Sequence, residues 1–123
     1  MNILAIDDNE DILMLLKTVL TSKDHNFTQV MSGREGVKLI ESQRFDAIIL
    51  DLAMPEFSGL DVIESLKKSS KISYQNIILF TASSATDKEI DVLLETDGIK
   101  ACIRKPVDIN VLINKVEEVG KSQ

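Results

Sequence analysis

Five side chains that can do chemistry stand at or just past the ends of four short, mainly apolar segments of the sequence. Three are carboxylates, one is a hydroxyl and one is an amine: Asp7, Asp8, Asp51, Thr81 and Lys105. If they meet, three carboxylates and one amine leave about two negative charges in a small space, which raises carboxyl pKa values or attracts a cation. Mg²⁺ is the natural candidate, because it accepts one or two carboxylates and keeps several waters.

Asp51 is the candidate for covalent chemistry within this set. A carboxylate can attack phosphorus and form an aspartyl phosphate. Transfer of a phosphoryl group requires that the charge on its equatorial oxygens be neutralised. A bound metal, the ammonium group of Lys105 and the hydroxyl group of Thr81 together suit that task. The residue types therefore predict phosphoryl chemistry at Asp51.

The five side chains can act together only if the fold brings the ends of the apolar segments to one edge. Strand-like segments alternate five times with segments whose apolar residues recur at helical spacing. The expected strands are residues 2–6, 27–31, 45–50, 77–80 and 101–104. This alternation predicts a doubly wound α/β fold, with five parallel strands in the flavodoxin-like order 2-1-3-4-5 and helices on both faces. The ligand crevice then opens at the carboxyl ends of the first and third strands.

Smaller signals set the boundaries of these elements. Thr86 with Glu89 three residues later predicts a capping box at the start of the fourth helix, and Gly98 is expected to end that helix. Residues 120–123 are expected to be a loose tail. His25 lies in a polar stretch and is expected to be a solvated loop residue.

Composition limits the classes of protein to which the chain can belong. Its 123 residues fit one domain, and the net charge of −6 argues against binding to nucleic acid phosphates. The single cysteine, Cys102, excludes an internal disulfide and indicates a reducing compartment. The first apolar run is too short for a signal peptide or a membrane span. We therefore expect a cytoplasmic domain over residues 1–123 that binds neither membrane nor nucleic acid.

The same residues resemble the receiver domain of response regulators, the phospho-accepting half of two-component signalling. The resemblance covers essentially the whole chain. Its motifs are Asp7-Asp8, D-L-A-M-P at 51–55 with Ser58-Gly59, Thr81-Ala82 and Lys105-Pro106. Each motif alone is weak, but all of them in order on the alternating scaffold are specific.

The resemblance implies a role for each acidic residue. Asp51 corresponds to the phosphorylated aspartate. Asp8 corresponds to the direct Mg²⁺ ligand, and Asp7 to its partner, which acts largely through water. The backbone carbonyl group of Ala53 corresponds to the remaining protein ligand, so the implied metal set is these four residues.

The resemblance also implies a conformational switch. Thr81 corresponds to the hydroxyl residue that turns toward the phosphoryl group, and Lys105 to the lysine that pairs with the acceptor. The bond between Lys105 and Pro106 is typically cis in this family. Cys102 departs from the pattern, because the family usually carries Tyr or Phe there, and that ring commonly moves inward with the hydroxyl residue. Ala53 and Ser83 occupy positions that tune the lifetime of the phosphate.

The implied function is a phosphorylation switch rather than an enzyme, since the domain would assist only its own phosphorylation and dephosphorylation. A sensor histidine kinase or a phosphotransfer protein would phosphorylate Asp51 with Mg²⁺. The fourth helix, fifth strand and last helix would then shift and signal to a downstream protein or an output domain that this chain lacks. Both a monomer and a weak dimer are compatible with the sequence.

Three other functions compete with this interpretation. A receiver-fold interaction module without phosphorylation would fit the absent ring at Cys102. A flavin carrier is disfavoured, because Asp7 and Asp8 stand where its phosphate-binding loop would lie. An aspartate-nucleophile phosphatase is disfavoured, because such enzymes typically carry a second Asp two residues after the nucleophile. In this chain Ala53 occupies that position. Taken singly, the acids could also be helix caps, but caps do not explain why each strand end of the crevice carries the required group.

Overall fold

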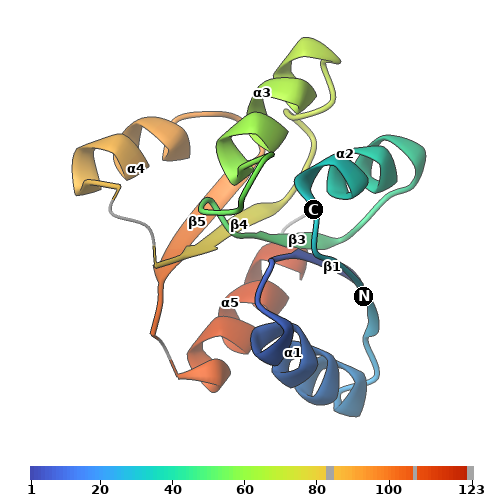
Figure 1. Ribbon diagram of the computed structural model, residues 1–123. Helices are drawn as coiled ribbons and strands as arrows, with labels where there is room; N and C mark the ends of the chain where they lie inside the picture. The colour runs from blue at the N-terminus through green and yellow to red at the C-terminus, as the bar shows by residue number, and fades with distance from the viewer. Residues whose placement is uncertain (83–84, 107, 122–123) are drawn as a thin grey trace.

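Five strands alternate with five helices in the computed structural model, which describes residues 1–82, 85–106 and 108–121 (Figure 1). Ser83, expected to tune the phosphate lifetime, lies outside the described residues. The elements are β1 (Asn2–Ile6), α1 (Glu10–Ser22), β2 (Asn26–Val30), α2 (Gly33–Ser42), β3 (Ala47–Leu50), α3 (Gly59–Lys68), β4 (Ile77–Thr81), α4 (Asp87–Leu94), β5 (Ile99–Arg104) and α5 (Ile109–Lys121).

The five strands form one parallel sheet in the order β2-β1-β3-β4-β5, which confirms the predicted topology. Ile6 at the end of β1 pairs with Leu50 at the end of β3. Thr81 at the end of β4 pairs with Arg104 at the end of β5. Because these strand ends are in register, the residues that follow them emerge at one edge of the sheet.

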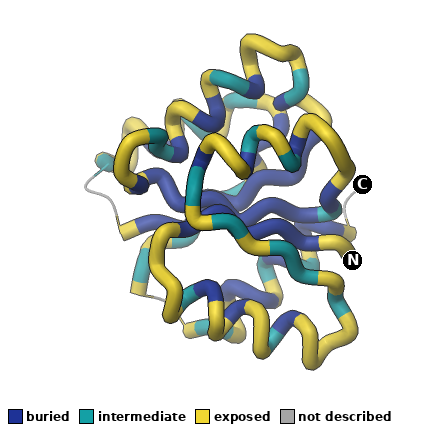
Figure 2. The backbone as a smooth tube through the Cα atoms, turned by 45° about the vertical axis from the view of Figure 1, so that its right-hand side comes forward, coloured by how far each residue is buried: buried dark blue, intermediate teal, exposed yellow. Residues whose placement is uncertain are grey.

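Two helical layers cover the sheet. Helices α2, α3 and α4 lie on one face, and α1 and α5 lie on the other (Figure 1). Successive strand residues therefore enter different cores: Ile48 and Leu50 pack toward the first layer, whereas Ala47 and Ile49 pack toward the second. Figure 2 shows the result, a buried sheet between helices whose outer sides are exposed. A strand with both faces buried has a continuous apolar sequence, as β3 has.

Side-chain caps fix the starts of the helices on the site side of the sheet. Asn9 accepts hydrogen bonds from the N–H groups of Asp11 and Ile12 at the start of α1. At the start of α3, Ser58 and Asp61 form a reciprocal capping box. Each helix thus begins a fixed distance after its strand.

The capping box predicted at α4 forms only in its first half. The Thr86 hydroxyl group accepts a hydrogen bond from the Glu89 N–H group at 3.2 Å, but no reciprocal bond from the Glu89 side chain is found within the described residues. Helix α4 also ends at Leu94, before the expected Gly98. Gly98 instead forms the turn into β5 with φ +95°, where a Cβ atom would meet the backbone carbonyl of Ile72.

Two further expectations are wrong. Gly120 and Lys121 are the last residues of α5 rather than the start of a loose tail, and residues 122 and 123 lie outside the described residues. Val116 and Val119 hold this end of the helix in the core between α5 and the sheet, and Gly120 is buried beside them. His25 lies in the loop before β2, as expected, but its side chain is only 11% exposed and is not solvated. Its Nε2 atom lies 2.8 Å from Glu117 Oε2 on α5, and its Nδ1 atom lies 3.1 Å from the amino group of Met1.

No helix among the described residues combines the length and the apolar character that crossing a bilayer requires. The Lys105–Pro106 peptide bond is cis, as the resemblance implied.

Candidate functional site

The three predicted acidic residues meet at the carboxyl edge of the sheet. One carboxylate oxygen from each of Asp7, Asp8 and Asp51 lies within 4.8 Å of the other two. Asp7 and Asp8 follow β1, and Asp51 follows β3, so the contact results directly from the pairing of these neighbouring strands. Among the described residues this is the group of acidic, His or Cys side chains close enough to share one metal ion.

The three acids differ in their exposure to solvent. Asp7 is 1% exposed and Asp51 is 4% exposed, whereas Asp8 is exposed. Burial raises the pKa of Asp7, and the nearby charge of Asp51 raises it further. Hydrogen bonds from Lys105 and from the Asn9 N–H group oppose this rise without cancelling it. The folded protein therefore holds an anion there at a cost that a bound cation would offset.

Lys105 supplies the positive charge of the site. Its Nζ atom lies 2.9 Å from Asp7 Oδ2 and 3.5 Å from Asp51 Oδ2, and its side chain is only 14% exposed. The same ammonium group lies 5.1 Å from the centre of the Phe80 ring. The backbone N–H group of Lys105 donates to the Thr81 carbonyl at 3.0 Å, which ties the residue after β5 to the end of β4.

The loop after β3 holds the Asp51 side chain in place. The Ala53 N–H group donates to Asp51 Oδ1 at 3.0 Å. The first residue of α3, Gly59, packs so closely that a Cβ atom there would meet the Asp51 carbonyl oxygen and lie 2.7 Å from Leu52 Cα. Met54 is buried in the same loop. One oxygen of Asp51 is thus fixed by the backbone, and Oδ2 faces Lys105.

Thr81 ends β4 and is fully buried, next to β3 in the sheet order and opposite Arg104 of β5. Its position at the edge agrees with the sequence analysis, and its role as a switch stays a prediction. Ala53 lies beside the Asp51 side chain, as expected. The role of its carbonyl group as a metal ligand stays a prediction.

The donor set suits a hard cation. Three carboxylates offer oxygen atoms only, and Mg²⁺ binds such atoms while retaining several waters. The exposure of Asp8 leaves the site open to solvent on one side, where those waters and an incoming phosphoryl group would lie. Asp7, Asp8 and Asp51 can hold the ion, and Lys105 can neutralise a second anion.

A contact between β5 and the start of α4 was not predicted from the sequence. The Arg104 guanidinium group donates to the Ala85 carbonyl at 2.8 Å and to Asp87 Oδ1 at 3.1 Å. Cys102, two residues earlier and on the same face of β5, is partly buried against the core beneath α2, α3 and α4. Burial raises the pKa of its thiol, which keeps it protonated and favours a packing role.

The chain matches a family model described as "Response regulator receiver domain" over residues 3–117. It is 32% identical over 114 residues to the CAI-1 autoinducer sensor kinase/phosphatase CqsS of Vibrio cholerae, covering 93% of this chain and 16% of that protein. It is also 32% identical over 118 residues to the transcriptional regulatory protein AfsQ1 of Streptomyces coelicolor, covering 96% of this chain and 50% of that protein. The chain thus spans half or less of these two curated relatives.

Solved structures agree with this match. The receiver domain of the Francisella response regulator 1452 superposes with a TM-score of 0.83 at 27% identity, over 98% of this chain and 96% of that one. The response regulator TrrA of Thermotoga maritima, solved in complex with Mg(2+)-BeF, superposes with a TM-score of 0.79 at 30% identity, over 96% and 97% of the two chains. On the family match, the relatives and the fold together, the chain belongs to the response regulator receiver domains.

Proposed function

We propose that this chain is a phosphorylation switch in which Asp51 accepts a phosphoryl group in a Mg²⁺-dependent reaction. The observation that carries the proposal is the convergence of Asp7, Asp8 and Asp51 within 4.8 Å, with the Lys105 ammonium group 2.9 Å from Asp7. Burying two carboxylates beside a third costs stability, which favours a functional role for this cluster over a purely structural one.

The proposed metal site consists of the carboxylates of Asp7, Asp8 and Asp51 together with the carbonyl group of Ala53. Bound Mg²⁺ would supply charge neutralisation for the transferring phosphoryl oxygens. The raised pKa of Asp7 supports this assignment, because it arises first from the burial of the charged carboxylate, and a bound cation would offset that cost.

The transfer step uses the Asp51 oxygen that no backbone N–H group is seen to hold among the described residues, the one that faces Lys105. Oδ1 is held by the Ala53 N–H group, so we assign the attack on phosphorus to Oδ2. A bond forms between Oδ2 and phosphorus while the bond between phosphorus and a donor histidine nitrogen breaks, and that nitrogen keeps the electron pair. Lys105, which lies 3.5 Å from Oδ2, would move onto a phosphoryl oxygen and offset its charge.

The switch follows from new partners for the phosphoryl oxygens. We propose that Thr81 turns toward them and that α4, β5 and α5 repack in response, as a population shift between two conformations. Cys102 carries no ring that could move inward, so we assign the coupling to Thr81.

The proposed phosphodonor is a sensor histidine kinase or a phosphotransfer protein. Relatives of this chain include a sensor kinase/phosphatase and a transcriptional regulatory protein, both longer than the matched segment. We propose that the signal passes to a downstream protein or to an output domain outside this sequence. On this account the chain assists its own phosphorylation and dephosphorylation and turns over no other substrate.

The test is to incubate the protein with Mg²⁺ and acetyl phosphate and to measure its intact mass. The proposal requires one added phosphoryl group in the natural protein and none in Asp51→Asn. An interaction module without phosphorylation predicts no added group and no spectral change with beryllofluoride, so this result would favour that second function.

A further inference from the structure

A groove of about 550 Å³ runs between α3 and α4, beside the loop that follows β3. Six of its described lining residues are apolar: Leu52, Ala53, Leu60, Ala85, Val92 and Leu93. Leu60 on α3 is 49% exposed and Val92 on α4 is 58% exposed, so aliphatic surface stands open on both walls. A volume of this size matches ligand sites, but half-exposed walls match a groove for a protein segment better than an enclosed pocket.

The walls of this α3–α4 groove are fixed by contacts outside it. The Ser58–Asp61 capping box and the close approach of Gly59 hold the start of α3 against the loop after β3. On the other side, the Arg104 guanidinium group holds the Ala85 carbonyl at 2.8 Å, one residue before the Thr86 cap of α4. A preformed groove reduces the ordering cost of binding.

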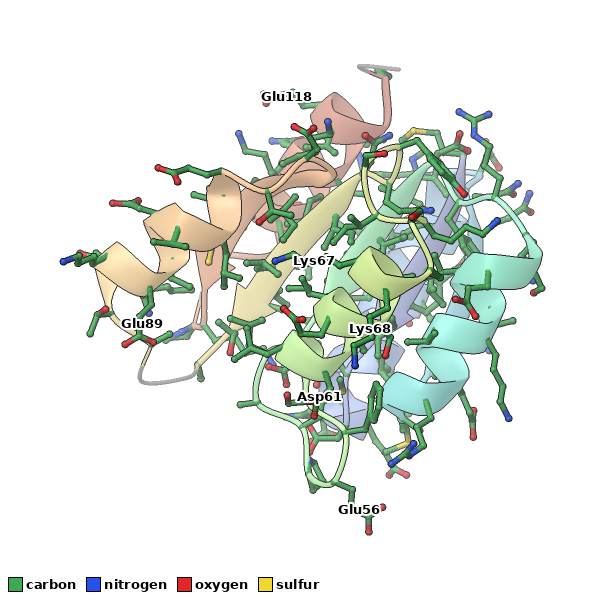
Figure 3. The ribbon with its side chains drawn as sticks, turned by 90° about the horizontal axis from the view of Figure 1, so that it is seen from above. Glu56, Asp61, Lys67, Lys68, Glu89 and Glu118 are labelled. Atoms are coloured by element: carbon green, nitrogen blue, oxygen red, sulfur yellow. The ribbon has the colours of Figure 1, made fainter. Side chains whose placement is uncertain are left out.

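The charge at the groove selects the chemistry of its occupant. Glu89 on α4 is the charged side chain among the described lining residues, and it is exposed. Glu64 and Lys67 share the helical face of Leu60 on α3, but they lie 3.6 Å from each other and offset one another. Figure 3, which looks down on these helices, labels Glu89 on α4 and Lys67 on α3. The described lining of the groove is therefore apolar, with the Glu89 carboxylate at its edge as its charged group.

We propose that the α3–α4 groove is a docking site for a segment of a separate partner protein that presents aliphatic side chains next to a basic residue. The aliphatic side chains would cover Leu60, Val92 and Leu93, and the basic side chain would face Glu89. The net charge of −6 favours the approach of such a segment.

The groove shares one residue with the acidic site. Ala53 lines the groove, and its N–H group donates to Asp51 Oδ1. A displacement of the loop that carries Asp51 would therefore change the contacts, and so the affinity, of a segment docked against Ala53. This coupling rests on the proposed function, whereas docking itself does not.

The docking test uses a synthetic Leu/Lys amphipathic peptide as the probe and the methyl resonances of the protein as the readout, without Mg²⁺ or phosphodonor. Saturable shifts at Leu52, Leu60, Val92 and Leu93 are expected, with weaker ones for the matched Leu/Glu peptide. Val92→Glu should weaken binding about tenfold relative to Val111→Glu. Val111 is a matched control on α5, since it is 53% exposed and the substitution adds the same charge. Shifts scattered over the surface, or equal affinities of the two variants, would overturn the proposal.

Two further measurements separate its parts. Glu89→Gln should weaken binding of the Leu/Lys peptide several-fold at low salt and less at high salt, because an exposed charge is screened. An unchanged affinity would refute the basic partner.

Beryllofluoride with Mg²⁺ should then alter the peptide affinity in the natural protein but not in Asp51→Asn. If docking occurs without this effect, the coupling fails while the docking site stands, and if beryllofluoride does not bind at all, the proposed function fails instead.

Discussion

Adding Mg²⁺ should raise the melting temperature of the natural protein, and the size of the rise can be worked out. A ligand at ten times its dissociation constant stabilises the folded state by about 1.4 kcal/mol. An unfolding entropy of about 2.1 cal/mol/K per residue gives roughly 0.26 kcal/mol/K for 123 residues. The expected rise is therefore about 5 °C, and each further tenfold increase in Mg²⁺ should add about as much again.

The pH dependence of this rise follows from Asp7. Burial raises the pKa of its carboxyl group in the folded protein, so without metal its charge costs stability as pH rises from the ordinary aspartate value through that raised pKa. Protons compete with Mg²⁺ for the same oxygen atoms. The rise in melting temperature should therefore be full at neutral pH and shrink as pH falls through the raised pKa.

Asp7→Asn should separate the cost of the buried charge from the stabilisation by Mg²⁺, because the substitution changes the melting temperature in opposite directions without and with the metal. Removing the buried charge should raise the melting temperature in the absence of metal and abolish most of the response to Mg²⁺. Asp8→Asn should lose the response as well, whereas Asp91→Asn, an exposed acid on α4, should keep it. Differential scanning calorimetry across pH measures all four proteins. A melting temperature that Mg²⁺ leaves unchanged at neutral pH, or a response that Asp8→Asn retains in full, would refute this reasoning.

Two substitutions test contacts beside the acidic site, and a third tests the contact between His25 and Glu117 at the opposite edge of the sheet. Lys105→Ala leaves Asp7 and Asp51 without their ammonium partner and should cost roughly 1–3 kcal/mol in urea denaturation, a deficit that Mg²⁺ should reduce; an unchanged deficit would contradict the electrostatic account. Gly59→Ala forces a Cβ atom onto the Asp51 carbonyl and should cost about 1–3 kcal/mol and slow phosphorylation; natural stability would show that the loop yields freely. A hydrogen bond from His25 lowers the pKa of Glu117, so Glu117→Gln should cost under about 1 kcal/mol at neutral pH, a deficit that should shrink as pH falls below the ordinary glutamate value and vanish once pH is below the lowered pKa of Glu117; a deficit that persists below that lowered pKa would exclude this hydrogen bond as its cause.

The strand order and the meeting of the acids could be predicted because they follow from patterns local to each segment. Residues 47–50 form an apolar run that ends at a carboxylate. Such a run indicates both a buried strand and the residue at which the chain leaves the sheet. Parallel pairing then leaves one edge for Asp7, Asp8 and Asp51.

Features that depend on distant partners could not be predicted in this way. His25 lies in a polar stretch, and only the fold brings Glu117, 92 residues away, within 2.8 Å of it. The sequence predicts Gly98 to stop a helix, yet its backbone conformation is set by the close approach of Ile72 in another loop. The contact from Arg104 to Ala85 likewise needs β5 beside the start of α4. Polar residues and glycines have several local explanations, so tertiary contacts decide among them.

The most direct test measures the rate of phosphorylation of Asp51 by acetyl phosphate as Mg²⁺ is titrated, with intact mass as the readout. The account predicts no phosphoryl transfer in the presence of a chelator. It also predicts a rate that saturates at the Mg²⁺ concentration that half-saturates the rise in melting temperature. Transfer to Asp51 that persists in the chelator, or its absence at saturating Mg²⁺, would contradict the claim that the acidic cluster serves phosphoryl chemistry through a bound cation.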